Sequence, residues 1–283
     1  MTINRILVIG AGTMGNGIAH VFAQHGSSVI LADVDDHRLT AGYETIGKNM
    51  DRQVSKGVVT EKEKDEAMKR IVRSTDLKSS APEADLVIEA ANENFGIKAE
   101  IFRMLDATTG KHAILASNTS SISITRLAGV TNRPEQVIGM HFFNPVPMMK
   151  LVEIVRGIDT STKTYKAVHE LAESIGKTPV EVNDSAGFVS NRVLMPMINE
   201  AIFCLQEGVA GAEQIDQVMT LGMAHPMGPL KLADFIGLDV CLSIMEVMFD
   251  DLGEDKYRPC PLLRKKVDAG HLGKKSGRGF YKY

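Results

Sequence analysis

The stretch I3-N-R-I-L-V-I-G-A-G-T-M-G15 decides the fold of this chain. Residues 3–9 form a largely apolar, β-branched run, which is typical of a strand buried on both faces of a parallel sheet. Gly10, Gly12 and Gly15 then give the pattern G-x-G-x-x-G directly before an apolar helical stretch, Met14–His25. Such a turn suits a dinucleotide pyrophosphate, because its glycines allow a tight bend, close approach of the phosphates and close helix packing. The stretch therefore predicts a dinucleotide-binding α/β domain.

The second predicted strand, Ser28–Ala32, ends at Asp33, about 20 residues beyond the glycines. An acid at this place accepts hydrogen bonds from the ribose hydroxyls and repels a 2′-phosphate, so NAD is favoured over NADP. Arg38 lies nearby and leaves NADP open as the alternative. Thr13 and Met14 complete the glycine turn and are expected to contact the cofactor with it.

Alternation of strands and helices continues to about residue 185 and then stops. Further strands are predicted at Asp85–Ala90, Ala113–Ala116, Val137–Met140, Leu151–Val155 and Thr178–Val182. Long helical patterns rich in methionine and leucine follow to the end of the chain. We therefore expect a Rossmann-type, doubly wound, mainly parallel sheet over residues 1–185 and an all-α domain over residues 186–283.

Residues 36–73 are too many for a simple crossover and are predicted to insert a helical hairpin. The second helix starts at T60-E-K-E63, a capping-box pattern, and the turn contains Lys56 and Gly57. Arg52 and Lys56 flank the tip, and we expect them to meet a phosphate-bearing substrate. The alternative is a solvated charged surface, since acids are interleaved with these bases.

Two polar segments follow predicted strands in the middle of the chain. S117-N-T-S-S121 follows one strand, and His141 follows the next. The carboxyl ends of neighbouring parallel strands open on one edge, where ligands bind, so a hydroxyl and an imidazole could share one substrate oxygen. Glu153 is the one acid in the apolar run 151–155, and His141 is its expected partner. The alternatives are a core histidine in an ordinary loop and an edge-strand acid that faces water.

The bulk composition excludes several classes of function. The 283 residues carry a net charge of −3, which gives no general attraction to nucleic acid or membrane surfaces. The three cysteines form no C-x-x-C and no cluster with histidine, so we expect no metal site and a reducing, cytoplasmic location. No secretory leader pattern precedes the first strand, and no apolar run approaches the roughly 18 residues of a membrane span.

Across essentially its whole length the chain resembles the 3-hydroxyacyl-CoA dehydrogenases, most closely the compact bacterial 3-hydroxybutyryl-CoA dehydrogenases. The motifs that carry the resemblance are G-A-G-T-M-G, S-N-T-S-S, H-F-F-N-P-V-P-M-M-K-L-V-E, A-G-F-V-S-N-R, H-P-M-G-P and G-K-K-S-G-R-G-F-Y. The resemblance implies NAD as cofactor, a CoA thioester as substrate, and a homodimer formed through the helical domain. The implied reaction interconverts (S)-3-hydroxybutyryl-CoA and acetoacetyl-CoA.

The resemblance also implies roles for individual residues. His141 matches the general base that takes the hydroxyl proton, Glu153 matches its carboxylate partner, and Ser120 and Asn191 match residues that contact the substrate. An unperturbed histidine titrates near 6.5, which suits a base and, in reverse, an acid. Further positions match residues that bind the cofactor: Glu93, Lys98, Asn118, Asn144 and Lys275.

Two other functions remain alternatives at this point. A β-hydroxyacid dehydrogenase acting on a free acid would have a similar two-domain build, but such enzymes usually hold the carboxylate with a lysine or an Arg/His pair. A non-enzymatic dinucleotide-binding protein is the other alternative, because a fold does not determine a function.

Overall fold

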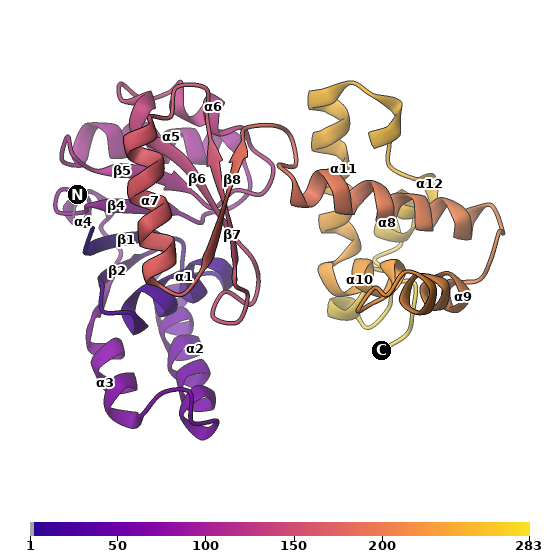
Figure 1. Ribbon diagram of the computed structural model, residues 1–283, viewed down its shortest axis with the longest axis horizontal. Coiled ribbons are helices and arrows are strands. Elements are labelled where there is room, and N and C mark those ends of the chain that lie inside the picture. Colours follow the sequence, from indigo (N-terminus) through magenta and orange to yellow (C-terminus); the bar gives the residue numbers. More distant parts are fainter. Residues whose placement is uncertain (1–2) are drawn as a thin grey trace. The chain divides into compact units, whose positions relative to one another are not determined.

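The computed structural model describes residues 3–283, and the chain divides into two compact units. The division lies between Asp184 and Ser185, next to the boundary expected from the sequence. Figure 1 shows an α/β unit followed along the chain by a helical unit. Each unit is described by itself.

The first unit contains an eight-stranded sheet in the order β3-β2-β1-β4-β5-β6-β7-β8. The strands are β1 Arg5–Ile9, β2 Ser28–Ala32, β3 Ile71–Ser74, β4 Leu86–Glu89, β5 Ile114–Ser117, β6 Val137–Phe142, β7 Leu151–Arg156 and β8 Thr178–Asn183. Every neighbouring pair is parallel except β6 and β7, which are antiparallel. The prediction of a doubly wound, mainly parallel sheet is therefore confirmed.

Helices pack on both faces of this sheet. They are α1 Thr13–Gln24, α2 Asp36–Ser55, α3 Glu61–Lys69, α4 Leu77–Ser80, α5 Phe95–Thr108, α6 Ile124–Ala128, the 3₁₀ turn η1 Pro134–Gln136, and α7 Thr162–Ser174. Ile6 and Val8 belong to one core cluster with buried residues of α1 and α7. Leu7 lies between them and faces the opposite side, because successive side chains of a strand alternate.

The helical hairpin forms where the sequence predicts it, with one correction. Figure 1 shows α2 and α3 extending beyond the sheet. Thr60 caps α3 in a capping box with Glu63, and Gly57 turns the chain with φ +69°. The hairpin does not continue to residue 73, because Ile71–Ser74 forms β3, which pairs in parallel with β2. This run is short and starts with β-branched residues, so it completes the sheet edge instead of extending the helix.

A second correction concerns His141, which was expected to follow its strand. It lies inside β6, which runs to Phe142, because the antiparallel ladder with β7 extends past Met140. His141 is therefore held by strand pairing on a rigid element.

The second unit is helical. Its elements are α8 Ser190–Gln206, α9 Ala212–Gln217, the π-helix η2 Val218–Gly222, α10 Pro229–Ile236, α11 Leu238–Leu252, the 3₁₀ turn η3 Asp255–Tyr257, α12 Pro261–Asp268 and the 3₁₀ turn η4 Lys274–Ser276. They share a core that includes Met195, Ile202, Leu230, Met245 and Leu263. Methionines thus contribute to the interior of this unit, as expected for a flexible apolar side chain.

Candidate active site

The glycine turn after β1 has the geometry that a bound dinucleotide requires. Gly10 has φ +99°, and a Cβ there would lie 2.6 Å from the Ala90 carbonyl oxygen. A Cβ on Gly15 would lie 1.7 Å from the Gly10 oxygen, so α1 packs directly against the turn. A Cβ on Gly12, in contrast, would meet nothing within 4 Å, and Gly12 lines a cavity. Two glycines therefore shape the turn, and the third leaves its backbone open to a ligand.

The cavity beside this turn has a volume of about 650 Å³. Gly10, Gly12, Thr13 and Asp33 line it, whereas Met14 packs against the apolar core and Gly15 is buried. Asp33 Oδ2 accepts a hydrogen bond from the Ala11 amide at 2.8 Å, which ties β2 to the turn. Together, the open backbone and the acid at the end of β2 fit a dinucleotide.

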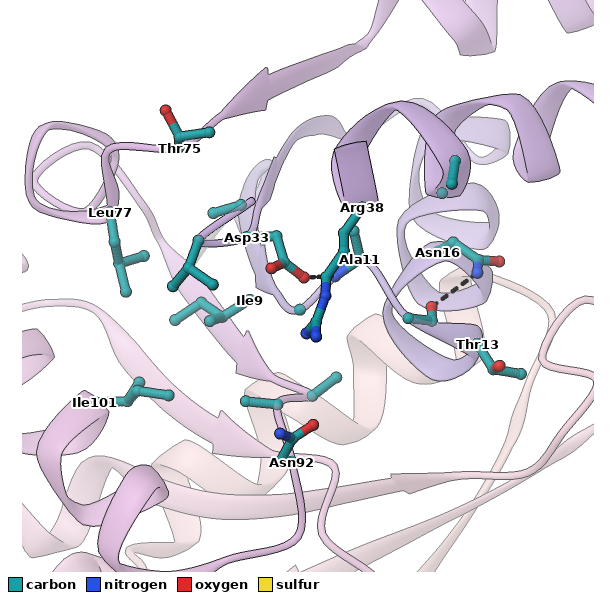
Figure 2. Close-up of a pocket in the computed structure, with 18 of the residues that line it drawn as sticks. Ile9, Ala11, Thr13, Asn16, Asp33, Arg38, Thr75, Leu77, Asn92 and Ile101 are labelled. Atoms are coloured by element: carbon teal, nitrogen blue, oxygen red, sulfur yellow. Dashed lines mark hydrogen bonds between the residues drawn. The ribbon is translucent and has the colours of Figure 1, made fainter. Parts of the chain in front are cut away.

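Arg38 lines the same cavity. Figure 2 shows its side chain extending from the first turn of α2 into the space beside Asp33. One anionic and one cationic side chain therefore line the same part of this cavity.

A charged network, buried at Glu89 and Lys98 and partly exposed at Glu93, lies at the ends of β4 and β5. Lys98, which is 1% exposed, contacts Glu89 Oε1 at 2.7 Å and Glu93 Oε2 at 3.3 Å. Glu93 Oε1 accepts hydrogen bonds from the backbone amides of Ser120 and Ser121. Burial raises the pKa of Glu93, but the charge of Lys98, the hydroxyls of Thr119 and Ser121 and the Ser120 amide outweigh burial, and the net pKa is lowered. The predicted residues Glu93, Lys98 and Ser120 are thus brought together.

Glu89 was not singled out from the sequence, although a signal was present. It is the last residue of a strand that is otherwise apolar, and it is 0% exposed. Because a buried carboxylate needs a partner, an acid in this apolar run predicts a nearby base, as Glu153 does for His141. For Glu89 that base is Lys98 on the following helix.

His141 and Glu153 are paired as the sequence suggested. They lie directly opposite each other in the β6–β7 ladder, and His141 Nδ1 is 2.7 Å from Glu153 Oε2. Their side chains are 10% and 4% exposed. Since an ionised carboxylate only accepts, the short contact assigns the proton to Nδ1 and leaves Nε2 as the basic nitrogen.

Asn118 connects the serine turn to the histidine strand. Its Oδ1 accepts a hydrogen bond from the Phe142 amide at 3.0 Å, next to His141. Phe143 adds a ring contact to the imidazole, with ring centroids 4.6 Å apart. Asn144 is exposed in the loop that follows. The carboxyl ends of β5 and β6 are thereby fixed relative to each other.

The remaining predicted residues lie elsewhere. Arg52 and Lys56 are exposed at the end of α2, and among the described residues neither makes an ion pair. Asn191 is buried in the first turn of α8, and Lys275 pairs with Asp239 at 2.6 Å, both in the helical unit.

The described part of the chain contains neither a metal-binding cluster nor a membrane-spanning helix. Residues 3–283 hold no cluster of three or more His, Cys, Asp or Glu side chains arranged to bind a metal ion. None of the helices described is both long enough and apolar enough to span a membrane.

Two family models together cover nearly the whole chain. The model of the 3-hydroxyacyl-CoA dehydrogenase NAD-binding domain matches residues 5–185, and that of the C-terminal domain matches residues 187–283. The chain belongs to the 3-hydroxyacyl-CoA dehydrogenase family. It is an NAD-dependent enzyme of this family, so the resemblance noted in the sequence is confirmed.

Relatives match over almost their full length. A probable 3-hydroxybutyryl-CoA dehydrogenase of Bacillus subtilis is 59% identical, covering 100% of this chain and 98% of the relative. The 3-hydroxybutyryl-CoA dehydrogenase of Bradyrhizobium diazoefficiens is 56% identical, and the match covers 99% of this chain and 96% of that relative. The crystal structure of (S)-3-hydroxybutyryl-CoA dehydrogenase from Ralstonia eutropha superimposes with a TM-score of 0.96 at 49% identity, covering 100% of this chain and 99% of that one.

Proposed function

We propose that this dehydrogenase interconverts (S)-3-hydroxybutyryl-CoA and acetoacetyl-CoA, with His141 and Glu153 as its acid–base pair. The observation that carries the proposal is the buried contact of 2.7 Å between His141 Nδ1 and Glu153 Oε2. Bound NAD supplies the hydride chemistry at C3 of the substrate.

The protein's own residues move the proton. His141 Nε2 takes the hydroxyl proton during oxidation and returns it during reduction. Glu153 holds the ring through Nδ1 and stabilises the imidazolium that forms. Ser120 and Asn191 contact the substrate, Ser120 at its reacting oxygen.

The proposed cofactor contacts fall into two groups. Gly12, Thr13 and Asp33 contact the adenosine and pyrophosphate half, because the helix N-terminus and the acid suit those groups, and Gly10, Met14 and Gly15 serve it by shaping the turn. The other proposed contacts are Glu93, Lys98, Asn118, Asn144 and Lys275.

The CoA phosphates need a cationic site, and we assign it to Arg52 and Lys56. Arg52 lies in the last turn of α2 and Lys56 is its C-cap, four residues on and still in helical conformation, so the two side chains lie on the same side of the helix end. Ion pairs hold Lys64 to Asp51 and Lys62 to Glu66 on the same hairpin. Arg52 and Lys56 therefore carry positive charge that these acids do not neutralise.

The proposal extends to assembly and location. The protein forms a homodimer through its helical unit and works in the cytoplasm. Analytical ultracentrifugation tests the first statement, and fractionation of the source cells tests the second.

Substitution of the base tests the reaction. Wild type is expected to oxidise NADH with acetoacetyl-CoA and not with free acetoacetate. His141→Gln is expected to lower kcat by about 10²–10⁴-fold. NADH affinity, measured by fluorescence titration, stays unchanged because the ring acts on the substrate oxygen. Near-normal turnover in His141→Gln would refute the assignment, and equal rates with free acetoacetate would favour an enzyme of free acids.

Rates with C4, C8 and C16 3-ketoacyl-CoA then define the chain-length preference.

A further inference from the structure

Glu89 is a fully buried acid whose role lies outside the acid–base pair. It is the last residue of β4 and is 0% exposed. Its Oε1 accepts from Lys98 Nζ and from the Ala91 amide, each at 2.7 Å. Its Oε2 accepts from Ser117 Oγ, also at 2.7 Å. A carboxylate with this many donors is built into the site, because an unpaired buried charge would be very costly.

Lys98 is shared between two carboxylates, and Glu89 is the stronger partner. The distance from Nζ to Glu89 is 2.7 Å, against 3.3 Å to Glu93. The Glu93 side chain is 39% exposed, so water screens its charge more than that of Glu89. The position of the Lys98 ammonium is therefore set mainly by Glu89.

The contacts continue from Lys98 to the serine turn. Glu93 contacts Lys98 with one oxygen, and its other oxygen accepts from the amides of Ser120 and Ser121 and from Ser121 Oγ. A displacement of Lys98 would thus move Glu93 and, with it, the backbone that carries Ser120.

We infer that Glu89 is a positioning residue of the dehydrogenase: it fixes Lys98 for the cofactor and, through Glu93, the turn that presents Ser120 to the substrate. The inference rests on the proposed roles of Lys98 and Ser120. Glu89 itself touches neither the substrate nor the cofactor and acts through Lys98.

A double-mutant cycle separates this role from a merely structural one. The variants are Glu89→Gln, Lys98→Gln and the double substitution, each measured for NADH Kd by fluorescence and for kcat and KM with acetoacetyl-CoA. Glu89→Gln alone is expected to raise the NADH Kd about tenfold, as for loss of a hydrogen bond to a charged group, and to lower kcat. In the Lys98→Gln background the same substitution is expected to change Kd by less than about twofold. Equal penalties in both backgrounds would overturn the inference.

Two further variants keep the test decisive. Glu89→Asp keeps the charge but shortens the side chain by one methylene, so it is expected to weaken NADH binding less than Glu89→Gln does. If Glu89→Gln does not fold, Glu89→Asp takes its place in the cycle. Ile88→Val is the matched control, because Ile88 is the neighbouring, 0% exposed residue of β4 and carries no charge. It is expected to lower Tm and leave the NADH Kd unchanged; a comparable loss of NADH affinity in Ile88→Val would overturn the inference.

The direct binding measurement also distinguishes this inference from the proposed function. If wild type fails to reduce acetoacetyl-CoA, the proposed substrate is wrong, while the NADH cycle still reports on Glu89 and Lys98. If wild type reduces it and the cycle is additive, the function stands and the role of Glu89 is refuted.

Discussion

Replacing Glu153 by glutamine removes one charge from the acid–base pair while keeping the size of the side chain. Both partners are buried, and His141 Nδ1 lies 2.7 Å from Glu153 Oε2, so this carboxylate stabilises the imidazolium formed during oxidation. Two unit charges about 4 Å apart interact by about 4 kcal/mol at an effective dielectric constant near 20. With about 1.4 kcal/mol per tenfold in rate, the loss corresponds to an upper limit near a thousandfold.

We therefore expect Glu153→Gln to lower kcat by about a hundredfold to a thousandfold. The assay is the decrease in NADH absorbance at saturating acetoacetyl-CoA, followed across pH because the histidine carries the proton. NADH Kd, measured by fluorescence titration, is expected to stay at the wild-type value, because Glu153 acts on the ring and not on the dinucleotide.

The matched control is Glu181→Gln on the adjacent strand β8. Glu181 pairs with Arg156 at 2.9 Å, but its side chain is 45% exposed, and an exposed ion pair contributes little. Wild-type kcat is expected there. Glu153 is not the partner of the base if folded Glu153→Gln retains kcat within about threefold of wild type, or if its loss of turnover is matched by an equal loss of NADH affinity.

Three other substitutions test separate parts of the structure. Asp33→Ser is expected to raise kcat/KM for NADPH relative to NADH, since it removes the anion that repels a 2′-phosphate; a wild-type preference for NADPH would instead make Arg38 the phosphate ligand. Arg52→Ala combined with Lys56→Ala is expected to raise KM for acetoacetyl-CoA several-fold, more at low salt, because charge-assisted phosphate contacts are lost. The NADH KM should stay constant, and an equal penalty on a pantetheine thioester without nucleotide phosphates would indicate a disturbed hairpin instead. Thr60→Ala is expected to lower the free energy of unfolding by about 1 kcal/mol in urea titration without changing kcat, because Thr60 caps α3; an unchanged unfolding midpoint would contradict this.

Local patterns in the sequence determined most of the first unit. The glycine turn and Asp33 depend on backbone conformation and on spacing along one β–α–β segment, which short-range rules describe well. The capping box at Thr60 is likewise local, and the structure contains it. The edge strand Ile71–Ser74 was missed, because four residues carry little periodicity and their pairing with β2 is a contact distant in sequence.

Tertiary structure decided which side chains of different strands and helices come into contact. The sequence suggested that Glu153 partners His141, but only the antiparallel register of β6 and β7 places them opposite each other, since a shift of one residue would turn either side chain to the other face. One network joins residues from two strands and a helix. Glu89 pairs with Ser117 across the parallel strands β4 and β5, and the packing of α5 buries Lys98 beside Glu89. Burial sets the strength of such contacts, and burial is a property of the packed sheet and helices together.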